Sequence, residues 1–323
     1  IFTSHNGKRP QLFSIVGNIG IGRRSFLAKR MIPILSNLFS RMIEIPINDG
    51  DNYNDICLKI ESVTYSADLK MEEPKIRSFT DDQAISRIIE NITSLIHRRT
   101  LPCFVDNNGV FLNNGNCIPP IRSIIEKCYD IKSLYLVFIT TRKFSQQYND
   151  FIVSAHIRQL SDEDSKALFQ ALATDIPVTS SDINKIVESV AGYPPSVHYI
   201  IDQIHSYGKD IVLNDNESIG NFYIRQFKQY ISNQKFNHNE EEILSLLVLH
   251  SPLSVKAINC FTNDYVGITK ALYNLIDRSF IDLILVNDEY RYRLAAPLTI
   301  IISRYFGKIK ETKLAEAKQP LLT

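Results

Sequence analysis

The 323-residue sequence lacks an excess of either charge, and it lacks an apolar run of membrane-spanning length. Its 36 Lys and Arg residues nearly balance its 35 Asp and Glu residues, which argues against a dedicated binder of the nucleic-acid backbone. No apolar stretch reaches the roughly 18–20 residues that a membrane helix requires, and no signal peptide is visible. We therefore expect neither a membrane nor a nucleic acid as partner.

The sequence also lacks a cysteine framework. Its five cysteines are odd in number, lie far apart and form no C-x-x-C pair, which argues against disulfides and against a zinc site. A cytoplasmic location is the natural expectation for such a chain. Because the sequence starts at Ile1 rather than Met and soon enters a strand, we expect a piece of a longer protein whose effector and sensor domains are not included.

The first half of the sequence alternates strand-like and helix-like segments. Strands are predicted at 12–16, 42–47, 101–105 and 134–140, and helices at 24–36, 80–98 and 121–128. Strands that are apolar on both faces and alternate with helices indicate a parallel, doubly wound α/β sheet.

The second half is predicted to be mainly helical. Helices are expected at 161–173, 180–190 and 196–207, followed by a polar loop at 209–218. Helices at 240–250, 254–260 and 266–278 then precede strands at 281–286 and 290–294, which is the order of a winged helix. The predicted domains are residues 1–155 (nucleotide-binding), 156–210 (small helical), 211–308 (winged helix) and 309–323 (linker).

The sharpest local motif is Gly17-Asn18-Ile19-Gly20-Ile21-Gly22-Arg23-Arg24-Ser25, which follows a strand and opens a helix. In a phosphate-binding P-loop, glycines let backbone amides surround phosphate oxygens, and the helix N-terminus adds a positive dipole. Arg23 stands where Lys is usual, and it still supplies charge and a fork of donors. Arg24 replaces the hydroxyl that normally holds Mg²⁺, which weakens the case for efficient phosphoryl transfer. A glycine-rich turn of a Rossmann-like fold is the alternative for the glycines alone.

Two further strand ends carry candidate site residues. Asp106 ends an apolar strand, where P-loop proteins place a carboxylate beside Mg²⁺, and it is the one candidate for a catalytic or metal-binding role, with a strand-end turn residue as the alternative. The next residue, where hydrolysing relatives have a second acid, is Asn107, and an amide cannot act as a general base. Arg142 follows the strand at 134–140 and is a candidate sensor of the terminal phosphate, with a solvated loop arginine as the alternative.

These motifs, taken in order, resemble the STAND ATPases, a family that includes plant resistance proteins, apoptosome-forming proteins and bacterial defence proteins. The segment 157–169 is similar to the entry into the small helical domain of that family, and Gly192-Tyr193-Pro194-Pro195 resembles its G-x-P turn. The segment 272–281 resembles a motif of the family's winged helix. A histidine that often follows the hairpin in relatives is replaced here by Ala296 or Pro297.

The resemblance implies an α/β P-loop NTPase domain followed by a small helical domain and a winged helix. It implies ATP or ADP as cofactor, with weakened binding of Mg²⁺. The implied nucleotide-binding residues are Gly17, Gly20, Ile21, Gly22, Arg23, Arg24, Ser25, Phe26, Arg142 and Pro195. It implies a switch that hydrolyses ATP slowly or not at all, self-associates on activation and controls a fused effector, in a setting such as antiviral defence. The alternatives are a degenerate pseudo-ATPase scaffold and a DNA-associated winged-helix regulator.

Overall fold

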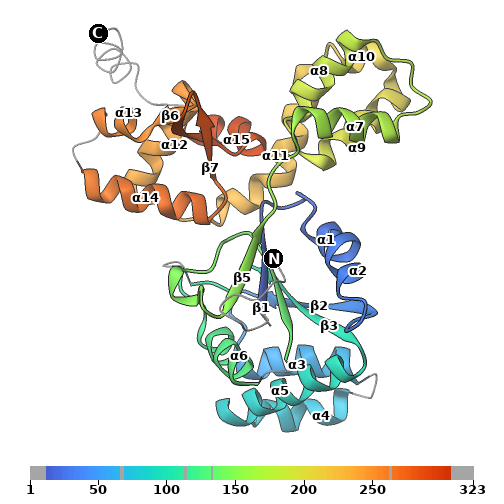
Figure 1. The fold of residues 1–323 in the computed structure, drawn as a ribbon, viewed down its shortest axis with the longest axis vertical. Helices are drawn as coiled ribbons and strands as arrows, with labels where there is room; N and C mark the ends of the chain where they lie inside the picture. The colour runs from blue at the N-terminus through green and yellow to red at the C-terminus, as the bar shows by residue number, and fades with distance from the viewer. Residues whose placement is uncertain (1–11, 66–68, 113–114, 132–133, 262–263, 307–323) are drawn as a thin grey trace. The chain divides into compact units, whose positions relative to one another are not determined.

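The computed structural model describes residues 12–65, 69–112, 115–131, 134–261 and 264–306, and the linker predicted beyond residue 308 lies outside them. The described chain divides into two units, which are treated separately (Figure 1). The first unit comprises the residues up to Gly17 and Gly22–Ile157. The second comprises Asn18–Ile21 and the residues from Arg158 onward. The division therefore falls inside the glycine-rich loop.

The first unit is built on a five-stranded parallel sheet in the order β2-β3-β4-β1-β5. The strands are β1 (Leu12–Val16), β2 (Arg41–Asn48), β3 (Thr100–Asn107), β4 (Leu136–Thr140) and β5 (Ile152–His156). Every residue of β1 and β4 is buried, as expected for central parallel strands, whereas the edge strands β2 and β5 have exposed positions. The predicted doubly wound sheet is confirmed. The edge strand β5 was not predicted, because its apolar positions are too few to mark a strand.

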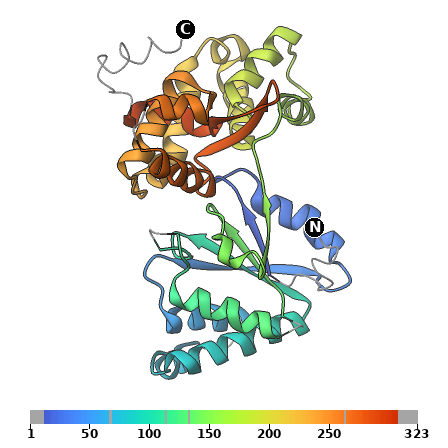
Figure 2. The same ribbon diagram turned by 60° about the vertical axis from the view of Figure 1, so that its left-hand side comes forward.

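Helices cover both faces of this sheet (Figure 2). A continuous helix of α1 (Arg23–Phe26), the π-helical η1 (Leu27–Met31) and α2 (Ile32–Ile34) packs with one face, and a short 3₁₀ turn, η2 (Gln146–Tyr148), lies before β5. The opposite face is covered by α3 (Tyr53–Thr64), α4 (Leu69–Arg77), α5 (Asp81–His97) and α6 (Pro119–Asp130). Neighbouring strand residues such as Leu12 and Phe13 belong to different cores, since side chains alternate along a strand.

Helix α5 begins where the sequence predicted. Thr80 accepts a hydrogen bond from the Gln83 amide (3.3 Å), and the Gln83 side chain accepts one from the Thr80 amide (2.9 Å). This reciprocal capping box satisfies two backbone donors that the helix itself leaves without acceptors. The fixed start directs the apolar stripe of α5, including Ala84, Ile88 and Ile92, into the core.

The second unit starts with a group of five helices, α7 (Asp162–Leu172), α8 (Ser180–Val190), α9 (Pro194–Tyr207), α10 (Lys209–Val212) and α11 (Asn216–Ser232). The prediction of a loop at 209–218 was wrong. Its polar residues begin helices, because Asp215 caps α11 by accepting from the amides of Glu217 and Ser218. The stability of α11 comes from aromatic residues further along it, which are buried.

The elements between residues 238 and 294 of the second unit form what we call the hairpin block. It contains α12 (His238–His250), β6 (Leu253–Ser254), α13 (Val255–Cys260), α14 (Tyr265–Asp277), β7 (Ile281–Val286) and β8 (Glu289–Leu294), and α15 (Ala296–Phe306) follows it. The strands form an antiparallel sheet in the order β6-β8-β7. Asn287 and Asp288 have φ of 49° and 60°, which suits the tight turn of a two-residue hairpin. The described helices include none that combines the length and apolarity needed to cross a membrane.

Candidate functional site

The glycine-rich loop leaves β1 and opens α1 in the way that the sequence predicts for a phosphate loop. The Gly17 amide donates to the Thr140 carbonyl (3.2 Å), which fixes the start of the loop to the end of β4. Gly20 and Gly22 have φ of 77° and 100°, a conformation that residues with a side chain rarely adopt. Gly22 is also the N-cap of α1 and provides no side-chain acceptor. The first amides of this helix are therefore available to an anion.

The loop has unsatisfied polar groups of the kind that a polyphosphate and its hydration shell can use. Within the described ranges, the amides of Gly20 and Gly22 donate to no backbone carbonyl. Asn18 is only 7% exposed, and its Oδ1 has no hydrogen-bond partner among the described residues. A buried polar atom without a partner costs free energy, so such an atom in a loop points to a ligand or to water. The residues of the loop fit a nucleotide.

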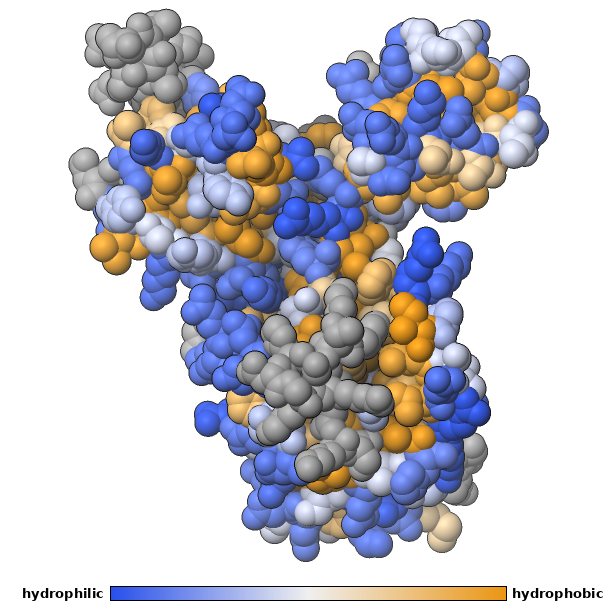
Figure 3. Space-filling model, viewed as in Figure 1, coloured by the Kyte–Doolittle hydropathy of each residue, from blue (hydrophilic) through white to orange (hydrophobic). Residues whose placement is uncertain are grey.

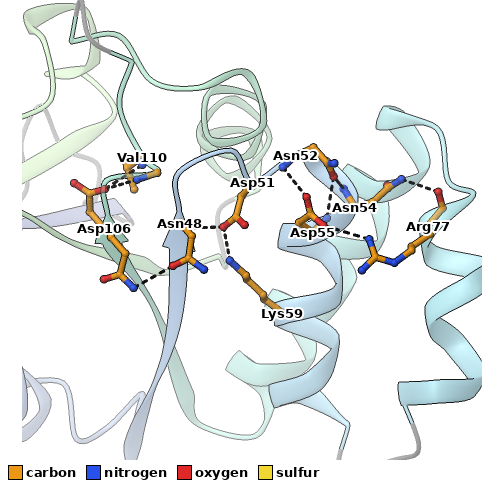
Figure 4. A network of polar contacts seen from close by, with 11 residues as sticks. Asn48, Asp51, Asn52, Asn54, Asp55, Lys59, Arg77, Asp106 and Val110 are labelled. Atoms are coloured by element: carbon orange, nitrogen blue, oxygen red, sulfur yellow. Dashed lines mark hydrogen bonds and ion pairs between the residues drawn. The ribbon is translucent and has the colours of Figure 1, made fainter. Parts of the chain in front are cut away.

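Arg23 and Asp106 place opposite charges in the same part of the first unit. Burial raises the pKa of the Asp106 carboxyl group, and backbone hydrogen bonds and the positive charge of Arg23 act in the opposite direction. Asp106 Oδ1 accepts hydrogen bonds from the amides of Gly109 (3.0 Å) and Val110 (3.1 Å), as Figure 4 shows in part. The carboxylate is thus held in a fixed position by the turn that follows β3.

The residue after Asp106 takes part in a second network. Asn107 Nδ2 donates to Asn48 Oδ1 at the end of the neighbouring strand β2 (3.2 Å). The Asn48 amide donates to Asp51 Oδ2 (2.6 Å), and the same carboxylate is paired with Lys59 (Figure 4). Sequence reasoning missed Asn48, although a polar residue at the end of a parallel strand was the signal that identified Asp106. The Asn107 amide is therefore oriented by Asn48.

The four remaining predicted residues of the first unit lie in different surroundings. Arg24 Nε donates to both carboxylate oxygens of Glu44 on β2 (2.8 and 2.9 Å). Ser25 is exposed on α1, and Phe26 packs against the apolar core. The Arg142 guanidinium lies against Gly115, where an added Cβ atom would be 2.2 Å from Nη2. None of these contacts is to a ligand, so the nucleotide-binding roles of the four residues stay predictions.

Gly20, Ile21 and Pro195 lie in the second unit. Ile21 is buried, and its amide donates to the Asn18 carbonyl (3.2 Å). A Cβ atom added to Gly20 would be 2.2 Å from Tyr193 Oη and 3.1 Å from Pro195 Cγ. The structure therefore brings Pro195 next to the loop tip. Tyr193, which sequence reasoning quoted only as part of the G-Y-P-P turn, is the nearer of the two.

The described residues contain no group of three or more His, Cys, Asp or Glu side chains arranged to hold a metal ion. Asp106 is the one predicted metal ligand, and a single carboxylate does not make a protein-only Mg²⁺ cage. Mg²⁺ that is bound mainly by phosphate oxygens needs few protein ligands. Asp106 thus fits a supporting role toward Mg²⁺ that arrives with a nucleotide.

Comparison with known proteins identifies the fold. No family model and no curated protein matches the sequence. Among solved structures, the Walker-type ATPase of Pyrococcus abyssi is similar, with 13% identity, a TM-score of 0.56 and 91% of each chain covered. A STAND protein with a tetratricopeptide-repeat sensor from Pyrococcus horikoshii gives 14% identity and a TM-score of 0.45 over 95% of this chain and 42% of that chain. AMPPCP-bound DnaA from Aquifex aeolicus gives 11% identity and a TM-score of 0.41, over 93% of this chain and 88% of that chain.

The chain has the α/β fold of the P-loop ATPases, a class of nucleotide-binding proteins. Within this class, the parallel sheet and the glycine-rich loop that joins β1 to α1 are the features that define the candidate site.

Proposed function

We propose that this chain is the nucleotide-dependent switch of a STAND-type ATPase, which binds ATP or ADP and hydrolyses ATP slowly or not at all. The observation that carries the proposal is the loop from Gly17 to Arg23, whose positive-φ glycines and uncapped helix start suit phosphate binding. In the proposal, the loop amides and Arg23 hold the phosphates, Asp106 supports Mg²⁺, and Pro195 packs on the base. Arg142 is assigned to sensing the terminal phosphate.

The expectation of slow turnover rests on the end of β3. Asp106 already accepts two backbone amides, and its neighbour Asn107 has no basic atom that could activate a water molecule. An exchange of ADP for ATP would then act mainly by shifting a conformational equilibrium, by as much as the two nucleotides differ in affinity for the two states. The output in this proposal is self-association and the activation of a fused effector, as in antiviral defence.

Exposed apolar side chains support self-association as the output. Tyr265, Val266 and Tyr273 of α14 are 67%, 77% and 62% exposed. Leu285 and Tyr290 at the tip of the β7–β8 hairpin are also exposed, and Figure 3 shows hydrophobic residues at the surface over α14. Tyrosine is among the residues that are enriched at protein interfaces.

The same block argues against the DNA-associated alternative. Arg278, one of two cations that α14 and its C-cap offer, is 7% exposed and pairs with Glu240 (3.2 Å). Its guanidinium also packs on the rings of Phe236 and Phe280. A cation that is buried in this way cannot contact a DNA phosphate without breaking the core of the block.

The proposal is tested by nucleotide binding and assembly together. Nucleotide released from the purified protein is identified by chromatography, and the affinities for ATP and ADP are measured by calorimetry with and without Mg²⁺. We expect micromolar or tighter binding, weak dependence on Mg²⁺, and a change in light scattering when ATP replaces ADP. Unchanged assembly in protein that neither contains nor binds nucleotide would favour the pseudo-ATPase scaffold instead.

A further inference from the structure

The tip of the phosphate loop, Asn18–Ile21, belongs to the second unit, where it packs with other residues of the same unit. Gly20 has a φ of 77°, which residues with a side chain rarely adopt, and it has no space for a side chain because Tyr193 Oη and Cζ and Pro195 Cγ lie against it. The turn that carries Tyr193 is itself fixed. The Leu160 amide donates to the Gly192 carbonyl (2.8 Å), and a Cβ atom at Gly192 would be 2.4 Å from the Leu160 carbonyl oxygen.

Tyr193 is fully buried and is surrounded by aromatic rings of α11. Its ring centroid lies 6.4 Å from that of Phe222, 5.9 Å from that of Tyr223 and 5.3 Å from that of Phe227. Tyr223 is fixed in turn, because its hydroxyl donates to the Val190 carbonyl (2.7 Å). In a densely packed group of this kind, the Tyr193 side chain cannot change position unless α11 responds.

The C-terminal part of α11 makes equally specific contacts with the hairpin block. Tyr230 lies three residues after Phe227 and so on the same side of the helix. Its ring stacks on Phe280 with centroids 5.6 Å apart, and its hydroxyl donates to the Arg278 carbonyl (3.0 Å). Continuous packing therefore runs from Gly20 through Tyr193 and α11 to the start of β7.

We propose that Tyr193 is a positioning residue for the phosphate loop and that it couples nucleotide binding at Gly20 to the hairpin block through α11. This inference rests on the proposed nucleotide site. Phosphate binding requires the amides of the loop tip in one orientation, and a buried ring that holds Gly20 supplies part of that order before the ligand arrives. Any movement of Gly20 on binding must be accommodated by Tyr193, and coupling between two sites is reciprocal.

The test compares Tyr193→Ala with Tyr193→Phe, which loses Oη but keeps the ring and its Cζ atom beside Gly20. Ile186→Val is the second control, a core change in the same unit at a residue that is fully buried. ADP affinity is measured by calorimetry, and hydrogen exchange of residues 226–231 and 278–281 is followed with and without ADP. We expect Tyr193→Ala to weaken ADP binding about tenfold and to abolish the ADP-dependent change in exchange. Tyr193→Phe and Ile186→Val should stay within about twofold of wild type and keep that change.

Wild-type affinity and a wild-type exchange response in Tyr193→Ala would overturn the inference and leave the proposed function intact. Failure of the wild-type protein to bind ADP would overturn both. If Tyr193→Ala does not fold, Tyr193→Leu replaces it, because Leu fills part of the volume but lacks a ring to hold Gly20. Wild-type binding and exchange in a folded Tyr193→Leu variant would likewise overturn the inference.

Discussion

The phosphate loop and the end of β3 differ in how far the protein itself satisfies their polar groups. In the loop, the helix start at Gly22 has no side-chain cap, and Asn18 Oδ1 is buried without a partner among the described residues. At the end of β3, Asp106 accepts hydrogen bonds from two backbone amides, and the Asn107 side chain donates a hydrogen bond to Asn48. The loop leaves polar groups that a ligand can use, whereas at the end of β3 the protein itself engages Asp106 Oδ1 and the Asn107 amide. This difference supports the proposed switch, which binds nucleotide without efficient turnover.

The largest expected effect comes from a change at the end of β3 that introduces a second acid. Asn107→Asp supplies the carboxylate that can activate water, and a positioned general base contributes about 10²–10⁴-fold to a rate. We expect ATP turnover to rise at least about 100-fold, because Asn48 can rotate its amide and donate to the new acid. Phosphate release under single-turnover conditions measures the effect. Asn107→Ala is the matched control, and equal turnover in the two variants would show that the missing base is not what limits hydrolysis.

The second prediction concerns the loop that receives the ligand. Arg23→Ala removes a charge-assisted contact to phosphate, which is typically worth about 1.5–3 kcal/mol. We therefore expect the Kd for ADP to rise by roughly 10–100-fold, with little change in the free energy of unfolding of the ligand-free protein. Calorimetry and urea unfolding measure the two quantities. Arg23→Lys should recover most of the affinity. Unchanged ADP binding in Arg23→Ala would show that Arg23 does not supply positive charge to the phosphates.

The third prediction tests Asp106, the partly buried acid at the end of β3, through the pH dependence of stability. Burial raises the pKa of Asp106, so the folded chain holds this proton to higher pH than the unfolded chain does. The stability that this group contributes is therefore complete below its unfolded pKa of about 3.9, and it is lost as the pH rises through the higher folded value. Asp106→Asn should be more stable than wild type at pH 7, and the difference should shrink toward pH 4. Urea unfolding at several pH values tests this prediction. A stability difference that grows toward acidic pH would show that the pKa of Asp106 is lowered in the folded chain rather than raised.

The sequence predicts the central sheet well because β1, β4 and residues 101–105 of β3 are buried and contain almost only apolar residues. It also predicts the loop and Asp106, since glycines after a strand and an acid at a strand end are local signals. It could not predict the partner of Asn107, because Asn48 is 59 residues away and meets it only through the pairing of β2 with β3. Tyr193 could not be assigned for the same reason, since its role depends on Gly20 and α11, which are distant in sequence.

The region between 209 and 218 shows a different limit. Its Asp, Asn and Ser residues suggest a loop, but the same residue types are good N-caps, and Asp215 acts as one. Whether such a stretch forms a helix depends on the apolar face that follows, and the aromatic residues of α11 provide it through tertiary packing.

The smallest expected effect distinguishes the role of Arg24 from that of its neighbour Arg23. Arg24→Ala removes an ion pair with Glu44 in which the two side chains are 59% and 35% exposed, and exposed pairs contribute about 0–1 kcal/mol. Because its Nε is already engaged by Glu44, we expect the Kd for ADP to stay within about twofold of wild type. Glu44→Ala is the matched control and should behave in the same way. If Arg24→Ala instead weakened ADP binding as much as Arg23→Ala and Glu44→Ala did not, Arg24 would leave Glu44 to contact phosphate, and the loop would hold its ligand with two arginines.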